Sequence, residues 1–171
     1  MVLRIVKYGD PVLEQRAEHV TNFGAPELRQ LVDSMFETMY ANKGIGLAAP
    51  QVALRQRLTV IDPSAGEDLN AKLVLINPEI LTKVGTQVGE EGCLSIPGFR
   101  EDVRRALKVR IRAQNVDGES FEVDGEELLA RAMQHELDHL NGVLFISHIS
   151  PLKRDLIRRK IRKLAKAGEW E

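Results

Sequence analysis

Two histidines four residues apart constrain this chain more than any other feature, in the segment His135-Glu136-Leu137-Asp138-His139. In an α-helix this spacing places both imidazoles on one face, where two ring nitrogens can bind the same metal ion. Leu128 and Ala132 fall on the same face, so the histidines lie on or beside a buried stripe, where unpaired imidazoles would be costly. Glu136 is close enough to exchange a proton with water on the metal. The segment therefore predicts a partly buried helix and metal-assisted hydrolysis.

The composition is that of a soluble domain. The 171 residues, 43% hydrophobic and 29% charged, are enough for a single domain over residues 1–171 with its own core. The net charge of −1 gives no argument for a nucleic-acid or membrane partner, and no apolar run approaches the ~20 residues of a membrane helix. The first residues lack the pattern of a secretory signal, so we expect a cytoplasmic protein. The single cysteine, Cys93, excludes an intramolecular disulfide.

Hydrophobic periodicity predicts an α+β fold. Apolar residues at helical spacing predict one helix from Pro26 to about Asn42 and another from about Leu152 to Ala167. The histidine-bearing helix follows Gly125. Strands are expected at 58–61, 73–76, 80–84, about 107–113 and around 121–123, the last two joined as a hairpin. Because strands occupy the middle of the chain and do not alternate with helices, the pattern favours α+β over a βαβ arrangement.

The third metal ligand is not determined by the helix alone. A catalytic site normally takes three protein ligands and leaves one position for water. His148 and Glu169 follow the helix, and many zinc proteases with this motif take their third ligand downstream. Cys93 is the other choice, although a lone cytosolic cysteine is usually an inert buried residue.

Three segments together resemble the signature motifs of peptide deformylases, in the same order and with the same wide spacing. They are Gly44-Ile45-Gly46-Leu47-Ala48-Ala49-Pro50-Gln51, Glu91-Gly92-Cys93-Leu94-Ser95 and Gln134-His135-Glu136-Leu137-Asp138-His139. The resemblance extends over nearly the whole chain. It implies an α+β fold in which a central metal-binding helix packs among antiparallel or mixed β-sheets, with N-terminal and C-terminal helices. The implied activity is removal of the N-formyl group from the initiator methionine of nascent polypeptides, with release of formate.

The resemblance also assigns the reacting groups. Cys93, His135 and His139 are the implied metal ligands, and Glu136 takes a proton from the attacking water and returns one to the departing amine. The side-chain amide of Gln51 and the backbone N–H of Leu94 are the implied donors to the oxyanion. The family prefers Fe²⁺, with zinc, nickel or cobalt able to occupy the same site. The chemistry of a thiolate with two imidazoles suits zinc at least as well as iron.

A methionine side chain needs an apolar pocket beside the metal. Helix geometry nominates Leu128 and Ala132 for this pocket, and the motifs add Ile45 and Leu94. Gly46 lacks a Cβ, so a substrate backbone can approach it closely. Arg100 resembles a family arginine near the substrate, and we expect it to pair with Glu91. The residues expected at the substrate are therefore Ile45, Gly46, Glu91, Arg100, Leu128 and Ala132.

The predicted C-terminal helix is strongly basic. Residues 152–167 hold eight Lys or Arg and one acidic residue, Asp155, around an apolar stripe. Such a face is usually only solvated. However, the substrate emerges from the ribosome, so ribosomal RNA is a plausible partner through phosphate contacts. We therefore expect ribosome docking through this helix.

Two other functions compete with this interpretation. One is a metalloprotease of the His-Glu-x-x-His type that cuts internal peptide bonds, and a requirement for Cys93 would discriminate against it. The other is a non-enzymatic protein with a structural metal. A closed structural site needs a fourth protein ligand, and the three motifs offer none.

Overall fold

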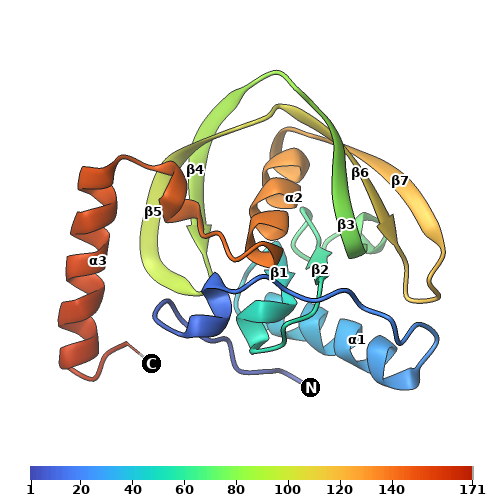
Figure 1. Ribbon diagram of the computed structural model, residues 1–171, viewed down its shortest axis with the longest axis horizontal. Coiled ribbons are helices and arrows are strands. Elements are labelled where there is room, and N and C mark those ends of the chain that lie inside the picture. Colours follow the sequence, from blue (N-terminus) through green and yellow to red (C-terminus); the bar gives the residue numbers. More distant parts are fainter. Residues whose placement is uncertain (171) are drawn as a thin grey trace.

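The histidine-bearing helix, α2 (Glu127–Leu140), lies at the centre of the molecule, between a five-stranded and a two-stranded sheet (Figure 1). The computed structural model describes residues 1–170. Ten residues of α2 are buried, because it contacts β-strands on both sides. The predicted α+β class is confirmed, with helices α1 (Pro26–Ala41) and α3 (Pro151–Lys166) on the outside.

All strand pairs in the two sheets are antiparallel. The larger sheet has the order β1-β2-β3-β6-β7 and the smaller sheet is the hairpin β4-β5. The strands are β1 (Gly46–Ala48), β2 (Leu58–Ile61), β3 (Leu73–Val84), β4 (Gln87–Cys93), β5 (Ile96–Arg105), β6 (Lys108–Gln114) and β7 (Ser120–Glu126). In β6 the apolar residues are buried and the cations between them are exposed, as their alternation predicts. The hairpin β6-β7 is confirmed.

One strand prediction was wrong. Residues 73–76 and 80–84 belong to one continuous strand, β3, because the ladder to β6 accommodates an irregularity between Ile76 and Glu79. Asn77 adopts φ 50° at this point. Its amide nitrogen donates to Gln114 Oε1 at 2.8 Å and to the carbonyl of Val20 at 3.0 Å, which holds the irregular backbone in place.

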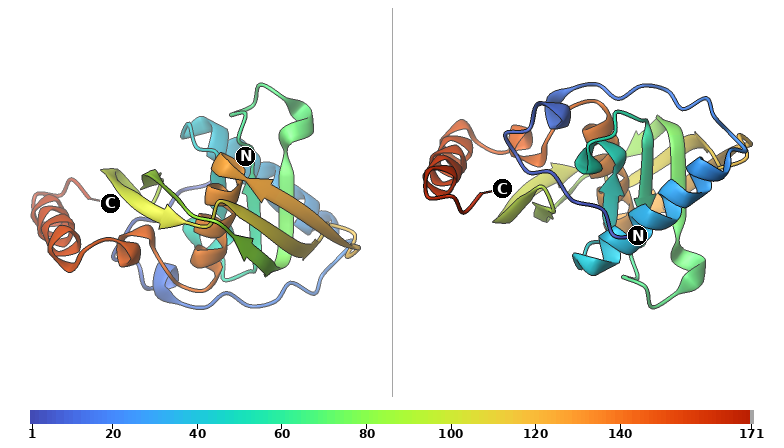
Figure 2. Two further views of the ribbon diagram at one scale, coloured as in Figure 1. Left: turned by 90° about the horizontal axis from the view of Figure 1, so that it is seen from above. Right: turned by 90° about the horizontal axis from the view of Figure 1, so that it is seen from below.

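Each helix buries a different apolar face. Helix α1 packs Met35 and Met39 against Leu47 and Leu58 of the larger sheet. Helix α2 packs Met133 and neighbouring residues against the β6 and β7 side of the same sheet. Helix α3 lies at one end of the molecule, next to the hairpin β4-β5 (Figures 1 and 2). Its buried residues Ile157 and Ile161 pack in a cluster with Ile96 and Val103 of β5.

The remaining elements among residues 1–170 are four short 3₁₀ turns, at Pro11–Glu14, Ala49–Val52, Leu69–Ala71 and Phe145–His148. The second turn carries Gln51 and directly follows β1, so it lies beside the start of the larger sheet. No helix among residues 1–170 combines the length and apolar character needed to cross a membrane.

Candidate active site and metal centre

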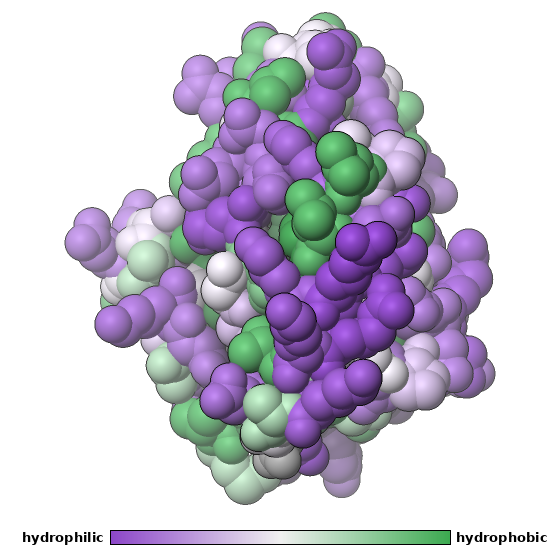
Figure 3. Space-filling view, turned by 90° about the vertical axis from the view of Figure 1, so that its left-hand side faces the viewer, coloured by the Kyte–Doolittle hydropathy of each residue, from purple (hydrophilic) through white to green (hydrophobic). Residues whose placement is uncertain are grey.

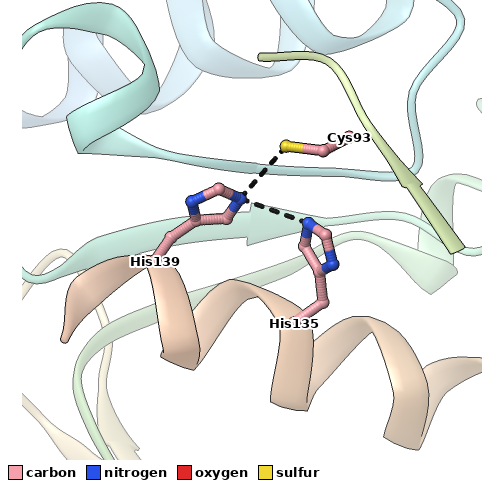
Figure 4. A group of neighbouring side chains, drawn as sticks. All are labelled: Cys93, His135 and His139. Carbon is pink, nitrogen blue, oxygen red and sulfur yellow. Dashed lines mark hydrogen bonds between the residues drawn. The ribbon is translucent and has the colours of Figure 1, made fainter. Parts of the chain in front are cut away.

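The three residues predicted as metal ligands lie together (Figure 4). His135 and His139 project from one face of α2, with their Nε2 atoms 3.2 Å apart. Cys93 comes from the end of β4, and its Sγ lies 3.4 Å from Nε2 of His139. All three ligand atoms lie within 4.8 Å of one another. Neither His148 nor Glu169 is part of the cluster, since Nε2 of His148 contacts Asp138 Oδ2 at 2.8 Å instead.

This geometry fits a metal ion. Ligand atoms of a tetrahedral site, about 2.0–2.3 Å from the ion, lie roughly 3.3–3.7 Å from one another. The two contacts at 3.2 and 3.4 Å are close to that range. Burial lowers the pKa of His139 well below its usual value, which favours the neutral imidazole that a metal requires. A thiolate and two imidazoles suit zinc and other late transition metals.

Glu91 determines which nitrogen of His135 faces the cluster. Its Oε1 lies 2.8 Å from Nδ1 of His135. Because an ionised carboxylate only accepts hydrogen bonds, Nδ1 carries the proton and the lone pair on Nε2 is left for a metal. Burial opposes ionisation of Glu91, but hydrogen bonds from Arg105 and His135 outweigh it and hold the pKa of Glu91 well below its usual range.

Two arginines hold Glu91 in this position. Arg105 donates Nε and Nη2 to its two carboxylate oxygens at 2.8 and 2.9 Å, and Arg131 donates Nη1 at 2.7 Å. All three side chains are at least 90% buried. The expected pairing of Glu91 with Arg100 was therefore wrong. Arg100 instead pairs with the exposed Glu90, because neighbouring residues of a strand point to opposite faces.

Glu136 occupies space left by a glycine. A Cβ at Gly46 would lie 2.7 Å from Oε1 of Glu136, so the carboxylate approaches β1 only because residue 46 has no side chain. The Oε2 atom is buried and has no hydrogen-bond partner among residues 1–170. Burial raises the pKa of Glu136 to about 7, in the range of a group that gives and takes protons near neutrality.

Gln51 is oriented by the backbone of β1. Its Oε1 accepts the N–H of Ala48 at 2.9 Å, which turns the Nε2 end toward the cluster. Nε2 lies 3.5 Å from Sγ of Cys93 and 3.2 Å from Oγ of Ser95. Gln51 is 1% exposed, so its amide donor is fixed in advance beside the predicted metal ligands.

A cavity of about 680 Å³ opens beside the cluster. It is lined by Cys93, His135, Glu136, Gln51 and Leu94 and by all six residues predicted at the substrate. Ala132 is buried in its wall, whereas Leu128 is half exposed at the start of α2. The cavity therefore combines apolar walls with the cluster and with the amide of Gln51, as a small-molecule or peptide-end site requires.

Residues 2–155 match the family model of polypeptide deformylases. The chain belongs to this family. A peptide deformylase of Acidobacterium capsulatum is 65% identical over 170 residues, covering 99% of both chains. The crystal structure of a peptide deformylase from Legionella pneumophila, 42% identical, matches with a TM-score of 0.91 over 100% of this chain and 99% of that one. The crystal structure of a peptide deformylase from Thermus thermophilus, 39% identical, matches with a TM-score of 0.86 over 95% of this chain and 94% of that one.

Membership of the deformylase family shows which reaction the protein catalyses. The protein is a deformylase, a metal-dependent hydrolase that acts in protein biosynthesis by removing the N-formyl group from nascent polypeptides. The predicted family and function are confirmed, and the metalloprotease alternative is not favoured.

Sequence reasoning missed part of this deformylase site. Arg105 was not predicted, although it holds Glu91 and also donates Nη1 to Asp138 Oδ2 at 2.7 Å. Ser95, within reach of Gln51, had no predicted role of its own. Buried ion pairs between strands leave no periodic pattern in the sequence. The sequence offered no signal for Arg105, because only the structure shows that its side chain faces inward and is 6% exposed.

Proposed function

We propose that Cys93, His135 and His139 hold the catalytic metal of this deformylase and that this metal is Fe²⁺. The convergence of one sulfur and two Nε2 atoms beside the Glu136 carboxylate carries the proposal. When bound, the metal supplies Lewis acidity and lowers the pKa of water. Zinc, nickel or cobalt would fit the same three donors, so the identity of the ion rests on the family resemblance and needs a direct test.

Glu136 is the proton carrier in this proposal. It lies in the wall of the cavity beside His135, and its Oε2 has no hydrogen-bond partner among residues 1–170. An unpaired carboxylate in this position takes a proton from the attacking water and returns one to the amine as the formyl C–N bond breaks. The products are formate and a peptide with a free N-terminus. Burial also excludes bulk water from the exchange.

The oxyanion donors are the amide of Gln51 and the backbone N–H of Leu94. Support comes from the orientation of Gln51, whose Oε1 is already used by Ala48, so that only its N–H groups face the cavity. Such donors need no reorganisation when negative charge develops on the formyl oxygen. Leu94 directly follows Cys93 at the turn between β4 and β5, which brings its backbone to the same place.

The substrate methionine occupies the apolar part of the cavity. Ile45, Leu128 and Ala132 supply apolar surface there. Arg100 lies at the mouth, where it can meet the peptide beyond the first residue. Glu91 is assigned a different role from the one predicted, because its carboxylate is fully used by Arg105, Arg131 and His135. It orients a metal ligand instead of contacting substrate.

Formate release from a formyl-methionyl peptide tests this assignment. The protein is purified without oxygen and loaded in parallel with Fe²⁺, Zn²⁺, Ni²⁺ or Co²⁺, and Glu136→Ala is compared with Glu79→Ala. Glu79 is exposed in β3 and does not line the cavity. We expect Glu136→Ala to bind metal and to lose activity while Glu79→Ala keeps it. Full activity in Glu136→Ala would refute the proton-carrier role, and higher activity with zinc than with iron would refute the choice of metal.

We also propose that the whole chain works as one catalytic domain in the cytoplasm and docks on the ribosome through α3. The face that carries α3 is mostly hydrophilic (Figure 3). Besides Arg162, four exposed cations on this helix form no ion pair with any residue in 1–170: Arg159, Lys160, Lys163 and Lys166. Free cations on a rigid helix are suited to phosphates of ribosomal RNA.

Removing α3 is a poor test of docking, because Ile157 and Ile161 are buried and truncation would expose a core. The double variant Lys160→Gln/Lys163→Gln keeps the helix. Its control, Lys83→Gln/Lys108→Gln, removes the same charge from the five-stranded sheet. We expect only the α3 variant to lose co-sedimentation with ribosomes. Equal binding by both variants would refute docking through α3 and would leave the deformylase assignment intact.

A further inference from the structure

A second cavity, of about 630 Å³, lies between the N-terminal segment and α3. It shares no lining residue with the cavity at the metal cluster. Val6 and Ile161 form a buried apolar floor, and Ala165 continues it along the helix. The deformylase reaction uses none of these residues, so the groove has no role in the activity described above.

The walls of this groove are cationic. Arg4 and Lys7 come from the N-terminal segment, and Arg158 and Arg162 come from α3. None of these four forms an ion pair with a residue in the described chain. The one carboxylate in the lining, Asp10, accepts the backbone N–H of Val12 at 3.1 Å and caps a 3₁₀ turn. The groove therefore carries an excess of positive charge that the rest of residues 1–170 does not neutralise.

An aromatic ring is fixed in the same groove. Trp170 Nε1 donates to the carbonyl of Tyr8 at 2.8 Å, and Phe99 meets the indole edge-on at 6.2 Å between ring centroids. Nζ of Lys7 lies 5.8 Å from the centroid of the Trp170 ring. Tyr8 is held as well, because its hydroxyl accepts Nε of Arg158 at 3.1 Å. Cations and aromatic surfaces are thus presented side by side.

We propose that this groove binds a nucleotide, with its phosphate at the cations and its base against Trp170. A nucleotide joins an anion to a flat ring, and proteins that hold single-stranded nucleic acid combine cationic grooves with aromatic side chains. The source is either a free nucleotide or one unit of single-stranded RNA. Arg158 and Arg162 lie one turn apart on α3 and face the groove, whereas Lys160 and Lys163 do not line it. The site is therefore separate from the cations proposed for ribosome docking.

The fluorescence of Trp170 is a direct reporter, because it is the only tryptophan in the chain. The intact protein is titrated with a short oligouridylate, with uridine monophosphate and with inorganic phosphate. We expect the first two to quench the fluorescence. Tighter, salt-sensitive binding of the oligonucleotide indicates RNA as the source, and equal binding of both indicates a free nucleotide. An absence of quenching, or binding of phosphate as tight as that of the nucleotides, overturns the proposal.

Matched variants locate the site. Lys7→Gln/Arg162→Gln removes two groove cations, and Lys160→Gln/Lys163→Gln removes two cations from the same helix outside the groove. We expect the first to weaken oligonucleotide binding about tenfold or more and to lower the salt slope by about 0.7 per cation removed. The second should bind as the parent does. Equal effects of the two variants would mean a diffuse charge effect and would refute the groove. Formate release should be unchanged in both, which separates this proposal from the deformylase activity.

Discussion

Glu91 and His135 are joined by a contact of 2.8 Å that links the hairpin β4-β5 to the central helix. The carboxylate is itself held by Arg105 and Arg131, so the orientation of one proposed metal ligand depends on two arginines outside the ligand cluster. Carboxylates behind metal-binding histidines commonly fix the tautomer and raise the basicity of the ligand.

Replacing Glu91 should therefore weaken metal binding. We expect Glu91→Gln to lower metal affinity roughly 10–100-fold, because a neutral amide oxygen accepts the Nδ1–H less strongly than a carboxylate and no longer raises the basicity of the imidazole. Competition with a chelator measures this affinity, and circular dichroism reports whether the fold survives. Glu90→Gln, a change of the same kind on an exposed neighbour, is the control. Unaltered affinity in a folded Glu91→Gln protein would contradict the proposed role.

Cys93→Ser tests the thiolate ligand. A serine hydroxyl is a poor donor to a soft metal, so we expect loss of bound metal and of formate release together. Elemental analysis of the purified protein gives the metal content. Ser95→Ala, two residues along the same turn, should retain its metal. A Cys93→Ser protein that kept both metal and activity would point to a site with a different third ligand.

Gln51→Leu should separate catalysis from metal binding. We expect kcat/KM to fall roughly 10²–10³-fold, as when one oxyanion donor is removed, while metal content stays unchanged. Steady-state kinetics with a formyl-methionyl peptide gives the ratio. The leucine also leaves the N–H of Ala48 without its acceptor, so thermal unfolding must be recorded alongside. A folded variant with parental kinetics would exclude Gln51 as a donor.

Gly46→Ala should displace Glu136, the proposed proton carrier, without touching a proposed metal ligand. The new Cβ would lie 2.7 Å from Oε1 of Glu136. We expect kcat to fall about tenfold or more, because proton transfer depends on the position of this carboxylate. Metal content should stay at the parental level, which separates displacement of Glu136 from loss of the ion. Parental kinetics in a folded Gly46→Ala protein would show that the packing of Gly46 against Glu136 has no catalytic importance.

A partly buried tyrosine predicts alkaline sensitivity of the fold. Tyr40 donates its hydroxyl hydrogen to Asp62, and burial together with this hydrogen bond raises the pKa of Tyr40 from 10.0 to about 12. A pKa raised by folding gives stability that is complete below pH 10 and is lost as pH rises toward 12. We expect the Tyr40→Phe variant to lack this fall in the free energy of unfolding when urea unfolding is measured across the same pH range. Tyr8→Phe, at the only other tyrosine, should show the same fall in the free energy of unfolding as the parent protein.

The helices and the isolated buried strands could be predicted from the sequence, because their apolar residues recur at one clear period. Helix α1 and strand β2 begin where the pattern places them. The hairpin β4-β5 was not predicted as strands. Gly89, Gly92 and a run of charged residues give β4 no alternation, and its stability comes from pairing and from the buried Glu91.

The residues of the candidate site also divide into those that the local sequence pattern predicts and those that it does not. His135, Glu136 and His139 follow from local helix spacing, which is enough to place them together. Cys93 and Gln51 could be added only through resemblance to a family, because their proximity depends on how β1 and β4 meet across the central helix. The pairing of Arg105 with Glu91 was out of reach, since nothing in the local pattern of β5 identifies a partner on the neighbouring strand.

The proposed metal ligands come from two parts of the chain that are far apart in sequence. Cys93 and His139 are separated by 46 positions, one at the turn of a hairpin and the other on the central helix. A bound ion would therefore act as a cross-link that closes a long loop, as a disulfide does in proteins with more cysteines. Removing the metal should free the tip of the hairpin to open locally. Faster amide hydrogen exchange at the tip would report this opening. Because an opened hairpin is easier for proteases to cleave, loss of the metal would also lead to degradation of the protein.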